Sequence, residues 1–226
     1  MSNNDERWLL ISGGSGGIGA ATCAALAQRG YKPVVGYCRN EATACEVAAL
    51  HGGRPLRLDL SDPTSIDQAA LQLAELPRLH GVVLAGAPPL RLTSFSKITP
   101  EDMAEQWQVG VLGPQRLLAE LLRRCFRQHK AGVVVGVLSM AMGDERSPAA
   151  PGMGAYVIAK FGLAGVLAQL AADHGWLRVR SVKPGYTETK MLEAFDARFL
   201  ELARAKAPFQ TPEQVAQQIV QEALDP

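Results

Sequence analysis

Two residues four positions apart could carry proton-transfer chemistry. They are Tyr156 and Lys160, in the run Ala-Tyr-Val-Ile-Ala-Lys over 155–160. If the run is helical, this spacing places both side chains on one face, about one turn apart. An ammonium beside a phenol favours the phenolate, so a group with an ordinary pKa of about 10 could exchange a proton near neutrality. Alone the pair is a weak signal, because most such pairs are a half-buried tyrosine beside a solvated lysine.

A glycine-rich turn near the start of the chain gives the pair a context. The run 12–19 reads Ser-Gly-Gly-Ser-Gly-Gly-Ile-Gly, between an apolar run at 8–11 and an alanine-rich run at 20–27. Glycine allows positive φ and close backbone approach, so a diphosphate could sit against the N–H groups that open the helix. The alternative is a flexible Gly/Ser linker. A linker need not stand between a buried-type strand and a good helix former, so the pattern favours a nucleotide site.

Strand and helix patterns alternate along the whole chain without a linker or internal repeat. Short apolar runs separated by helical segments predict right-handed crossovers and a parallel sheet covered on both faces. The strands are expected at 8–12, 33–37, 55–59, 81–86, 133–139 and 178–184. The helices are expected at 17–29, 41–51, 63–75, 100–129, 154–174, 189–205 and 211–223. The loop 141–154 should overhang the site.

Composition excludes several classes of protein. A chain of 226 residues with 47% hydrophobic content can bury roughly 70–75% of its unfolded surface in one domain, taken as 1–226. A net charge of +1 argues against nucleic acid as the main partner. The polar start of the chain does not resemble a signal peptide, and no stretch reaches about 18 apolar residues without charge, so no membrane span is expected. Four scattered cysteines indicate reduced thiols in the cytoplasm rather than disulfides or a zinc site. They are Cys23, Cys38, Cys45 and Cys125.

Six landmarks in order resemble the short-chain dehydrogenase/reductase family of the one-domain type, over nearly the whole chain. The family's glycine turn matches Ser12, Gly13, Gly17 and Gly19, and its adenine-side aspartate matches Asp59. Only the Ala85-Gly86 half of its Asn-Asn-Ala-Gly motif is present. Its catalytic serine matches Ser139, its Tyr-x-x-x-Lys matches Tyr156 and Lys160, and its Pro-Gly matches Pro184-Gly185, with Thr189 following. The resemblance implies a Rossmann-like, doubly wound parallel sheet of about six strands with helices on both faces.

The resemblance also implies residue roles. In ketone reduction Tyr156 would be the general acid, Lys160 would lower its pKa, and Ser139 would orient the carbonyl. No metal site is expected. The cofactor-binding residues would be Ser12, Gly13, Ser15, Gly17, Ile18, Gly19, Arg39, Asp59, Leu60, Ala85, Gly86, Tyr156, Lys160, Pro184, Gly185, Thr187 and Thr189.

The end of the second strand bears on cofactor choice. NAD-preferring enzymes usually place a carboxylate there to bond the ribose 2′-hydroxyl. This chain reads Tyr-Cys-Arg-Asn over 37–40, without a carboxylate. Arg39 offers a planar fork suited to a 2′-phosphate, and Ser15 could add a hydroxyl, so NADP(H) is the expected cofactor. The alternative is that Arg39 is a solvated residue at the start of the next helix.

Three features depart from the family pattern. Gly110 stands where many relatives carry an asparagine that marks a local helix distortion, and a glycine can keep such a distortion. The segment between Ser139 and Tyr156 is longer than expected, so 144–146 could reshape the substrate mouth. The usual seventh strand is missing from this sequence, which disfavours the usual tetramer and leaves a homodimer through 100–129 and 154–174 as the expectation.

The substrate is the least determined part. The turn, the Tyr37-Cys38-Arg39 pocket and the length are closest to 3-oxoacyl-(acyl-carrier-protein) reductases. A carrier protein could dock on a basic cluster of Arg123, Arg124, Arg127 and Lys130, unless these cations only complement a helix end. Met191, Leu192, Phe195 and Phe199 lie in a lid-like segment running to Phe209 and suggest an acyl-bearing substrate, or simple packing.

Two alternatives to a ketone reductase stay open. One is a nucleotide-binding regulatory or scaffold protein on a decayed reductase frame, which Gly110 and the eroded 83–86 motif favour. The other is a sugar or small-alcohol dehydrogenase that works in the oxidative direction.

Overall fold

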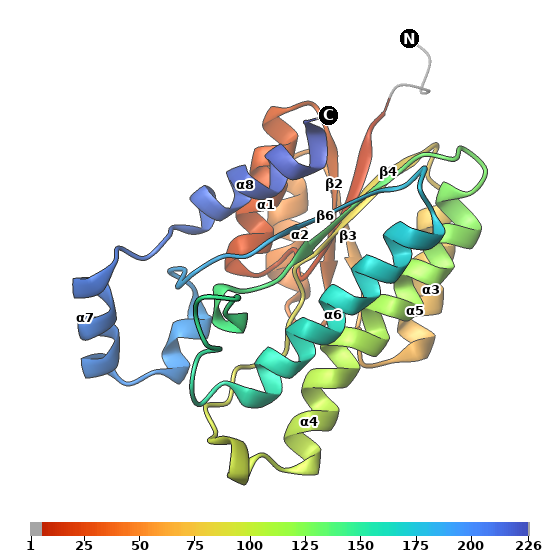
Figure 1. Cartoon of the computed structure of the whole chain (residues 1–226). Coiled ribbons are helices and arrows are strands. Elements are labelled where there is room, and N and C mark those ends of the chain that lie inside the picture. Colours follow the sequence, from red (N-terminus) through yellow and green to blue (C-terminus); the bar gives the residue numbers. More distant parts are fainter. Residues whose placement is uncertain (1–5, 226) are drawn as a thin grey trace.

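A six-stranded parallel sheet forms the centre of the molecule, with strand order β3-β2-β1-β4-β5-β6 (Figure 1). The computed structural model describes residues 6–225. Every residue of β1 and β5 is buried, as expected for strands covered on both faces. The strands are β1 (Trp8–Ser12), β2 (Lys32–Tyr37), β3 (Arg54–Arg57), β4 (Leu79–Leu84), β5 (Val133–Val137) and β6 (Arg178–Val182).

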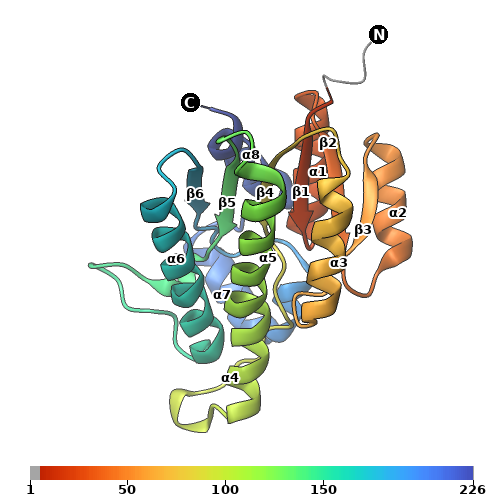
Figure 2. The same ribbon diagram turned by 90° about the vertical axis from the view of Figure 1, so that its right-hand side faces the viewer.

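Helices cover both faces of this sheet (Figure 2). The main helices are α1 (Gly17–Gln28), α2 (Glu41–Leu50), α3 (Pro63–Ala74), α4 (Pro100–Trp107), α5 (Gly113–Leu121), α6 (Gly154–Asp173), α7 (Ala197–Lys206) and α8 (Pro212–Leu224). Two π-helical turns, Gln108–Leu112 and Leu122–Phe126, flank α5. Short 3₁₀ turns lie at Phe95–Lys97, Met140–Met142 and Lys190–Ala194.

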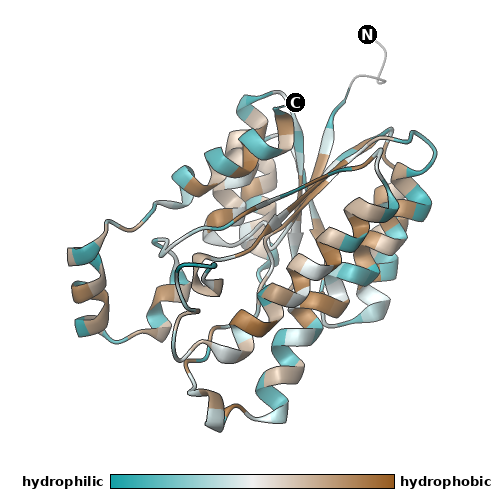
Figure 3. Cartoon of the chain, in the orientation of Figure 1, coloured by the Kyte–Doolittle hydropathy of each residue, from teal (hydrophilic) through white to brown (hydrophobic). Residues whose placement is uncertain are grey.

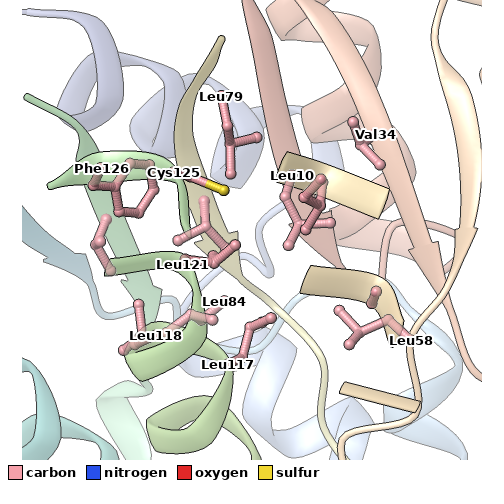
Figure 4. Packing of buried hydrophobic residues seen from close by; sticks show 14 of the residues in the cluster. Leu10, Val34, Leu58, Leu79, Leu84, Leu117, Leu118, Leu121, Cys125 and Phe126 are labelled. Atoms are coloured by element: carbon pink, nitrogen blue, oxygen red, sulfur yellow. The ribbon is translucent and has the colours of Figure 1, made fainter. Parts of the chain in front are cut away.

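Alternate residues of the strands feed two separate cores. Leu10 faces the core formed with α3, α5 and α6, whereas its neighbour Leu9 faces the core formed with α1, α2 and α8. The first core is drawn in Figure 4, where Leu117, Leu121 and Phe126 pack toward the sheet. Figure 3 shows the matching pattern, with apolar positions gathered on the strands and on the sheet-facing sides of these helices. This confirms the predicted doubly wound α/β class.

Several predicted element boundaries were wrong. The third strand ends at Arg57 instead of 59, and the fifth at Val137 instead of 139. The helix predicted at 189–205 is divided, because Asp196 accepts a hydrogen bond from the Phe199 N–H (2.8 Å) and starts α7 anew.

The helix predicted at 100–129 is interrupted by its two π turns. Pro114 lacks an N–H and cannot donate to the carbonyl of Gly110, four residues earlier, so the first turn widens. This matches the distortion expected at Gly110.

Helix α6 is long and apolar enough, by length and composition, to cross a membrane. In the structure Leu163, Leu167 and Leu170 are buried in the first core. Tyr156 and Lys160 in its first half are also buried. Packing inside the molecule therefore accounts for part of the hydropathy of α6, since 39% of its apolar window is buried.

Parallel strands end at one common edge, and the motif residues collect there. Successive strands deliver the glycine turn after β1, Arg39 after β2, Asp59 after β3, Ala85 and Gly86 after β4, Ser139 after β5, and Pro184 after β6. The strands after β1 are added on one side of it (β2, β3), and those from β4 on are added on the other side. Doubly wound sheets bind ligands at this point, between β1 and β4, where the order of strands reverses.

Candidate active site

The glycine turn is tied to the end of β4 by one hydroxyl. Ser12 Oγ accepts hydrogen bonds from the N–H groups of Ala85 and Gly86, both at 3.1 Å. Gly13 has φ 68°, and a Cβ there would stand 2.8 Å from Gly86 Cα. A Cβ at Gly19 would stand 2.1 Å from the Gly13 carbonyl oxygen. The turn therefore has room for backbone only, and the surviving Ala-Gly half of the family motif is what the contact requires.

Helix α1 begins with its N–H groups unshielded. Gly16 at the N-cap supplies no side-chain hydrogen bond, and the first turn carries no acidic residue. Unpaired N–H groups and the positive end of the helix dipole favour an anion at this point. A Cβ at Gly17 would lie 2.8 Å from Thr189 Cγ2, so the loop that follows β6 packs against the start of α1.

A cavity of about 1260 Å³ opens along this edge of the sheet. Eleven of the predicted cofactor residues line it: Gly13, Ser15, Gly17, Ile18, Gly19, Arg39, Asp59, Leu60, Ala85, Gly86 and Thr189. Predicted site residues that do not line it are Ser12, Ser139, Tyr156, Lys160, Pro184, Gly185 and Thr187. Lining residues that the sequence analysis missed include Asn40, Thr43, Ser61, Val109, Lys190 and Arg204. The position of Asn40 and Ser61 just beyond strand ends is the signal that could have found them.

One end of the cavity is a polar pocket around Asp59. Its carboxylate accepts hydrogen bonds from the Ser61 N–H (2.9 Å) and the Ser61 hydroxyl (2.6 Å), and these lower its pKa. Burial and the neighbouring Asp59 raise the pKa of the Cys38 thiol. Arg39 is exposed, and among residues 6–225 no carboxylate forms an ion pair with it. A free guanidinium thus faces the space beyond β2.

Tyr156 and Lys160 lie at the buried start of α6, with relative exposures of 7% and 8%. The Lys160 ammonium donates a hydrogen bond to the Val137 carbonyl of β5 (2.6 Å) and lies 5.5 Å from the centre of the Tyr156 ring. Ser139 follows β5, and its Oγ accepts a hydrogen bond from the Ala141 N–H (3.1 Å). The structure therefore brings together the three residues that the sequence singled out for chemistry.

The pKa of Tyr156 differs from the sequence expectation. Burial raises it above the ordinary value, and a hydrogen bond from Ser139 offsets this in part. Burial lowers the pKa of Lys160 to about 8. The expected lowering by Lys160 is not seen, because desolvation penalises both charged forms and the ammonium is held by the Val137 carbonyl. A protonated Tyr156 is suited to donate a proton.

Comparisons with known proteins identify the family of this chain. Residues 7–198 match the family model described as short chain dehydrogenase. The chain belongs to the short-chain dehydrogenase family. It is 29% identical to a 3-oxoacyl-(acyl-carrier-protein) reductase of Synechocystis, covering 96% of this chain and 89% of that one. It is 30% identical to an acetoacetyl-CoA reductase of Rhizobium meliloti, over 86% and 80% of the two chains.

Solved structures show the same fold. The structure of gox2181 aligns with a TM-score of 0.86 at 23% identity, over 97% of this chain and 89% of that chain. As a member of this family, the protein is an oxidoreductase that acts on CH–OH and C=O groups.

Gly110, where many dehydrogenases of this family carry asparagine, lies against α6. A Cβ at Gly110 would stand 3.2 Å from the Cβ of Ala159, tighter than an ordinary contact. The π turn around it places Val109 on the cavity wall. The glycine thus allows the distorted helix to approach α6 next to Tyr156.

A further part of the cavity wall comes from residues 188–209, here called the lid. Met191, Leu192 and Phe195 line the cavity, whereas Phe199 stacks on Phe195 with ring centres 5.1 Å apart. Tyr186, just before the lid, contacts Phe195, Phe199 and Phe209. The apolar stripe of the sequence is therefore partly a cavity wall and partly packing within the lid.

Two predicted surface features have more specific environments than the sequence suggested. In the basic cluster, Arg123 and Arg124 both form ion pairs with Glu120. Arg127 and Lys130 follow at the helix end, where Lys130 has φ 44°.

The tip of the loop 141–154 projects from the body instead of covering the site (Figure 2), and only its ends, including Ala141 and Met153, pack beside Tyr156.

Proposed function

We propose that this dehydrogenase reduces a ketone to a secondary alcohol with NADPH. The observation that carries the proposal is the group of partly buried Ser139 and buried Tyr156 and Lys160, at the sheet edge that also holds the glycine-turn cavity. A protein that only bound a nucleotide would have no use for a tyrosine whose proton is kept by burial beside a serine hydroxyl.

The residues present fit a dinucleotide. Gly13 and Gly17 have no side chains that would block a diphosphate, and the N–H groups of α1 point to the same place. NADPH rather than NADH is proposed because Arg39 is exposed, unpaired among the described residues and on the cavity wall. A guanidinium matches a 2′-phosphate in shape and charge.

In the proposed mechanism, the hydride for the carbonyl carbon would come from a bound nicotinamide. The Ser139 hydroxyl donates a hydrogen bond that orients the ketone oxygen. Tyr156 transfers its phenolic proton to that oxygen, so the ketone becomes an alcohol and the tyrosine a phenolate. The Lys160 ammonium stabilises this phenolate by its charge and would bond the nicotinamide ribose. The proton is restored from solvent.

The proposed substrate is a 3-oxoacyl thioester, on a carrier protein or coenzyme A. The names of the two relatives support this choice, as does the apolar lid wall of Met191, Leu192 and Phe195. If a carrier protein docks on the basic cluster, Arg127 and Lys130 would meet it first, because Glu120 engages the other two arginines. We also propose a homodimer through α4, α5 and α6, and a role in a biosynthetic pathway. The proposed location is the cytoplasm, which suits the four free cysteines.

The test is NADPH oxidation, followed by absorbance, with 3-oxoacyl thioesters, diketones and quinones, and with NADH in parallel. Tyr156→Phe should lower kcat by about 10³-fold or more while leaving the Kd for NADPH within about threefold. Tight NADPH binding without turnover on any ketone would instead support the regulatory alternative, for which Gly110 in place of asparagine is the specific observation.

A further inference from the structure

The lid is closed at its base by a single residue, Gln210. The Gln210 N–H donates to the Tyr186 carbonyl (2.8 Å), and its carbonyl accepts from the Glu188 N–H (2.9 Å). These two bonds form a short parallel bridge between Thr187 and Gln210. Closing a loop of this length costs conformational entropy, so the bonds at its neck determine where the whole lid stands.

The side chain of Gln210 makes a further bond that backbone pairing does not require. Its Oε1 accepts a hydrogen bond from the Gly185 N–H (2.9 Å), in a partly buried position. The preceding carbonyl, that of Pro184, accepts from the Met140 N–H (2.9 Å). Met140 directly follows Ser139. One continuous path of short bonds therefore joins the neck of the lid to the serine of the site.

The side chains of Met140 and Gln210 both border the open side of Gly185, at ordinary contact distances. A Cβ at Gly185 would stand 3.4 Å from Met140 Sδ and 3.8 Å from Gln210 Oε1. A shift of Gln210 would therefore reach Gly185 and Met140 through these hydrogen bonds, since Met140 itself is 67% exposed.

We infer that Gln210 is a positioning residue that couples the position of the lid to the Pro184–Gly185 segment and to Ser139. This inference rests on the proposed reductase function. Binding of cofactor against Gly185 orders the lid through the Gln210 amide, and a lid closed on substrate holds the Ser139 side of the site. Gln210 touches no reacting atom.

Two substitutions separate the side-chain bond from the backbone bridge. Gln210→Leu keeps the bridge and removes the acceptor, whereas Gln210→Glu keeps an acceptor oxygen at the same reach. Gln217→Leu, on the exposed side of α8, is the matched control. We expect Gln210→Leu to lower kcat/KM for the ketone about tenfold, mostly in kcat, while Gln210→Glu and Gln217→Leu stay within about twofold of the parent.

A second readout does not depend on turnover. Tryptic cleavage in the lid, at Arg198 and Arg204, is followed with and without saturating NADPH, whose Kd is measured separately. NADPH should slow cleavage in the parent protein and in Gln210→Glu, and have no effect on cleavage in Gln210→Leu, although that variant still binds NADPH. If no ketone is reduced by the parent, the proposed function fails, while this readout still decides the coupling.

Four results would overturn the inference. Two concern cleavage: NADPH still slows tryptic cleavage of the lid in Gln210→Leu, or NADPH does not slow it in the parent protein. Two concern kinetics: Gln210→Glu or Gln217→Leu loses as much kcat/KM as Gln210→Leu, or the defect of Gln210→Leu is confined to the Kd for NADPH.

Discussion

The glycine turn and the lid, which both line the cavity, are built on different principles. At the glycine turn, backbone meets backbone and there is no space for a Cβ at Gly13 or Gly19. In the lid, α7 has no buried residue, and the segment is held by aromatic contacts such as Phe195 on Phe199 and by Gln210 at its neck. If the proposed cofactor binds at the turn and the proposed substrate under the lid, the region fixed by backbone suits an invariant ligand, and the region fixed by a few side chains can adapt to different substrates. The following changes test this contrast.

The largest effect is expected at Gly19. In Gly19→Ala the new Cβ would lie 2.1 Å from the Gly13 carbonyl oxygen, so the turn must move. We expect a loss of about 3–5 kcal/mol in the free energy of unfolding, measured in urea, and no measurable NADPH binding. Gly165→Ala in α6 is the control, because nothing lies within 4 Å of its Cβ. That control should be neutral or up to about 1 kcal/mol more stable. Normal NADPH binding by Gly19→Ala would contradict the description of the turn.

The next effect is a pH dependence from Lys160. Its pKa is lowered from 10.5 to about 8 by burial, so between these values the unfolded chain binds the proton and the folded chain does not. Stability should therefore rise as the pH rises through this window, by about 3 kcal/mol in total. Lys160→Met should remove most of that rise. Equal slopes of unfolding free energy against pH in the two proteins would show that Lys160 is not the group responsible.

A smaller and more selective effect is expected at Arg39. Arg39→Ala should raise the KM for NADPH about 10- to 50-fold and change that for NADH less than about threefold, because only NADPH carries the 2′-phosphate. Raising the salt concentration should reduce the difference in KM for NADPH between the parent and Arg39→Ala. Parallel changes for both cofactors would indicate a general structural role for Arg39.

The smallest effect is expected within the lid. Glu188 and Arg204 pair at 3.0 Å with side chains 45% and 47% exposed, and such pairs contribute about 0–1 kcal/mol. Glu188→Gln should leave global stability within about 0.5 kcal/mol and speed tryptic cleavage of the lid less than about threefold. A large loss of global stability would show that the lid is part of the core, and the contrast between the glycine turn and the lid would disappear.

The sequence predicted those parts of the site that backbone geometry dictates. Glycines between an apolar strand and an alanine-rich helix have few other uses, and the ends of parallel strands necessarily share an edge. The clustering of Ser139, Tyr156 and Lys160 followed from the family resemblance. Their roles stay proposals.

Features that depend on tertiary surroundings were not predictable in the same way. The raised pKa of Tyr156 results from burial, which no local pattern reveals. Gln210 gave no signal, because its partner Gly185 lies 25 positions away. The pairing of Arg123 and Arg124 with Glu120 was different, since spacings of three and four on a helix could have been noticed in the sequence.

The strand order has a consequence for how the protein is made. β1 pairs with β2 on one side and with β4 on the other, so Leu9 meets Gly81 only after more than seventy residues have been synthesised. Until then one long side of β1, a strand whose residues are all buried in the folded protein, has no hydrogen-bonding partner, a state prone to aggregation. The glycine turn and its partners Ala85 and Gly86, just after β4, come together at that same stage. The nascent chain therefore passes through a vulnerable interval that ends when its nucleotide cradle forms.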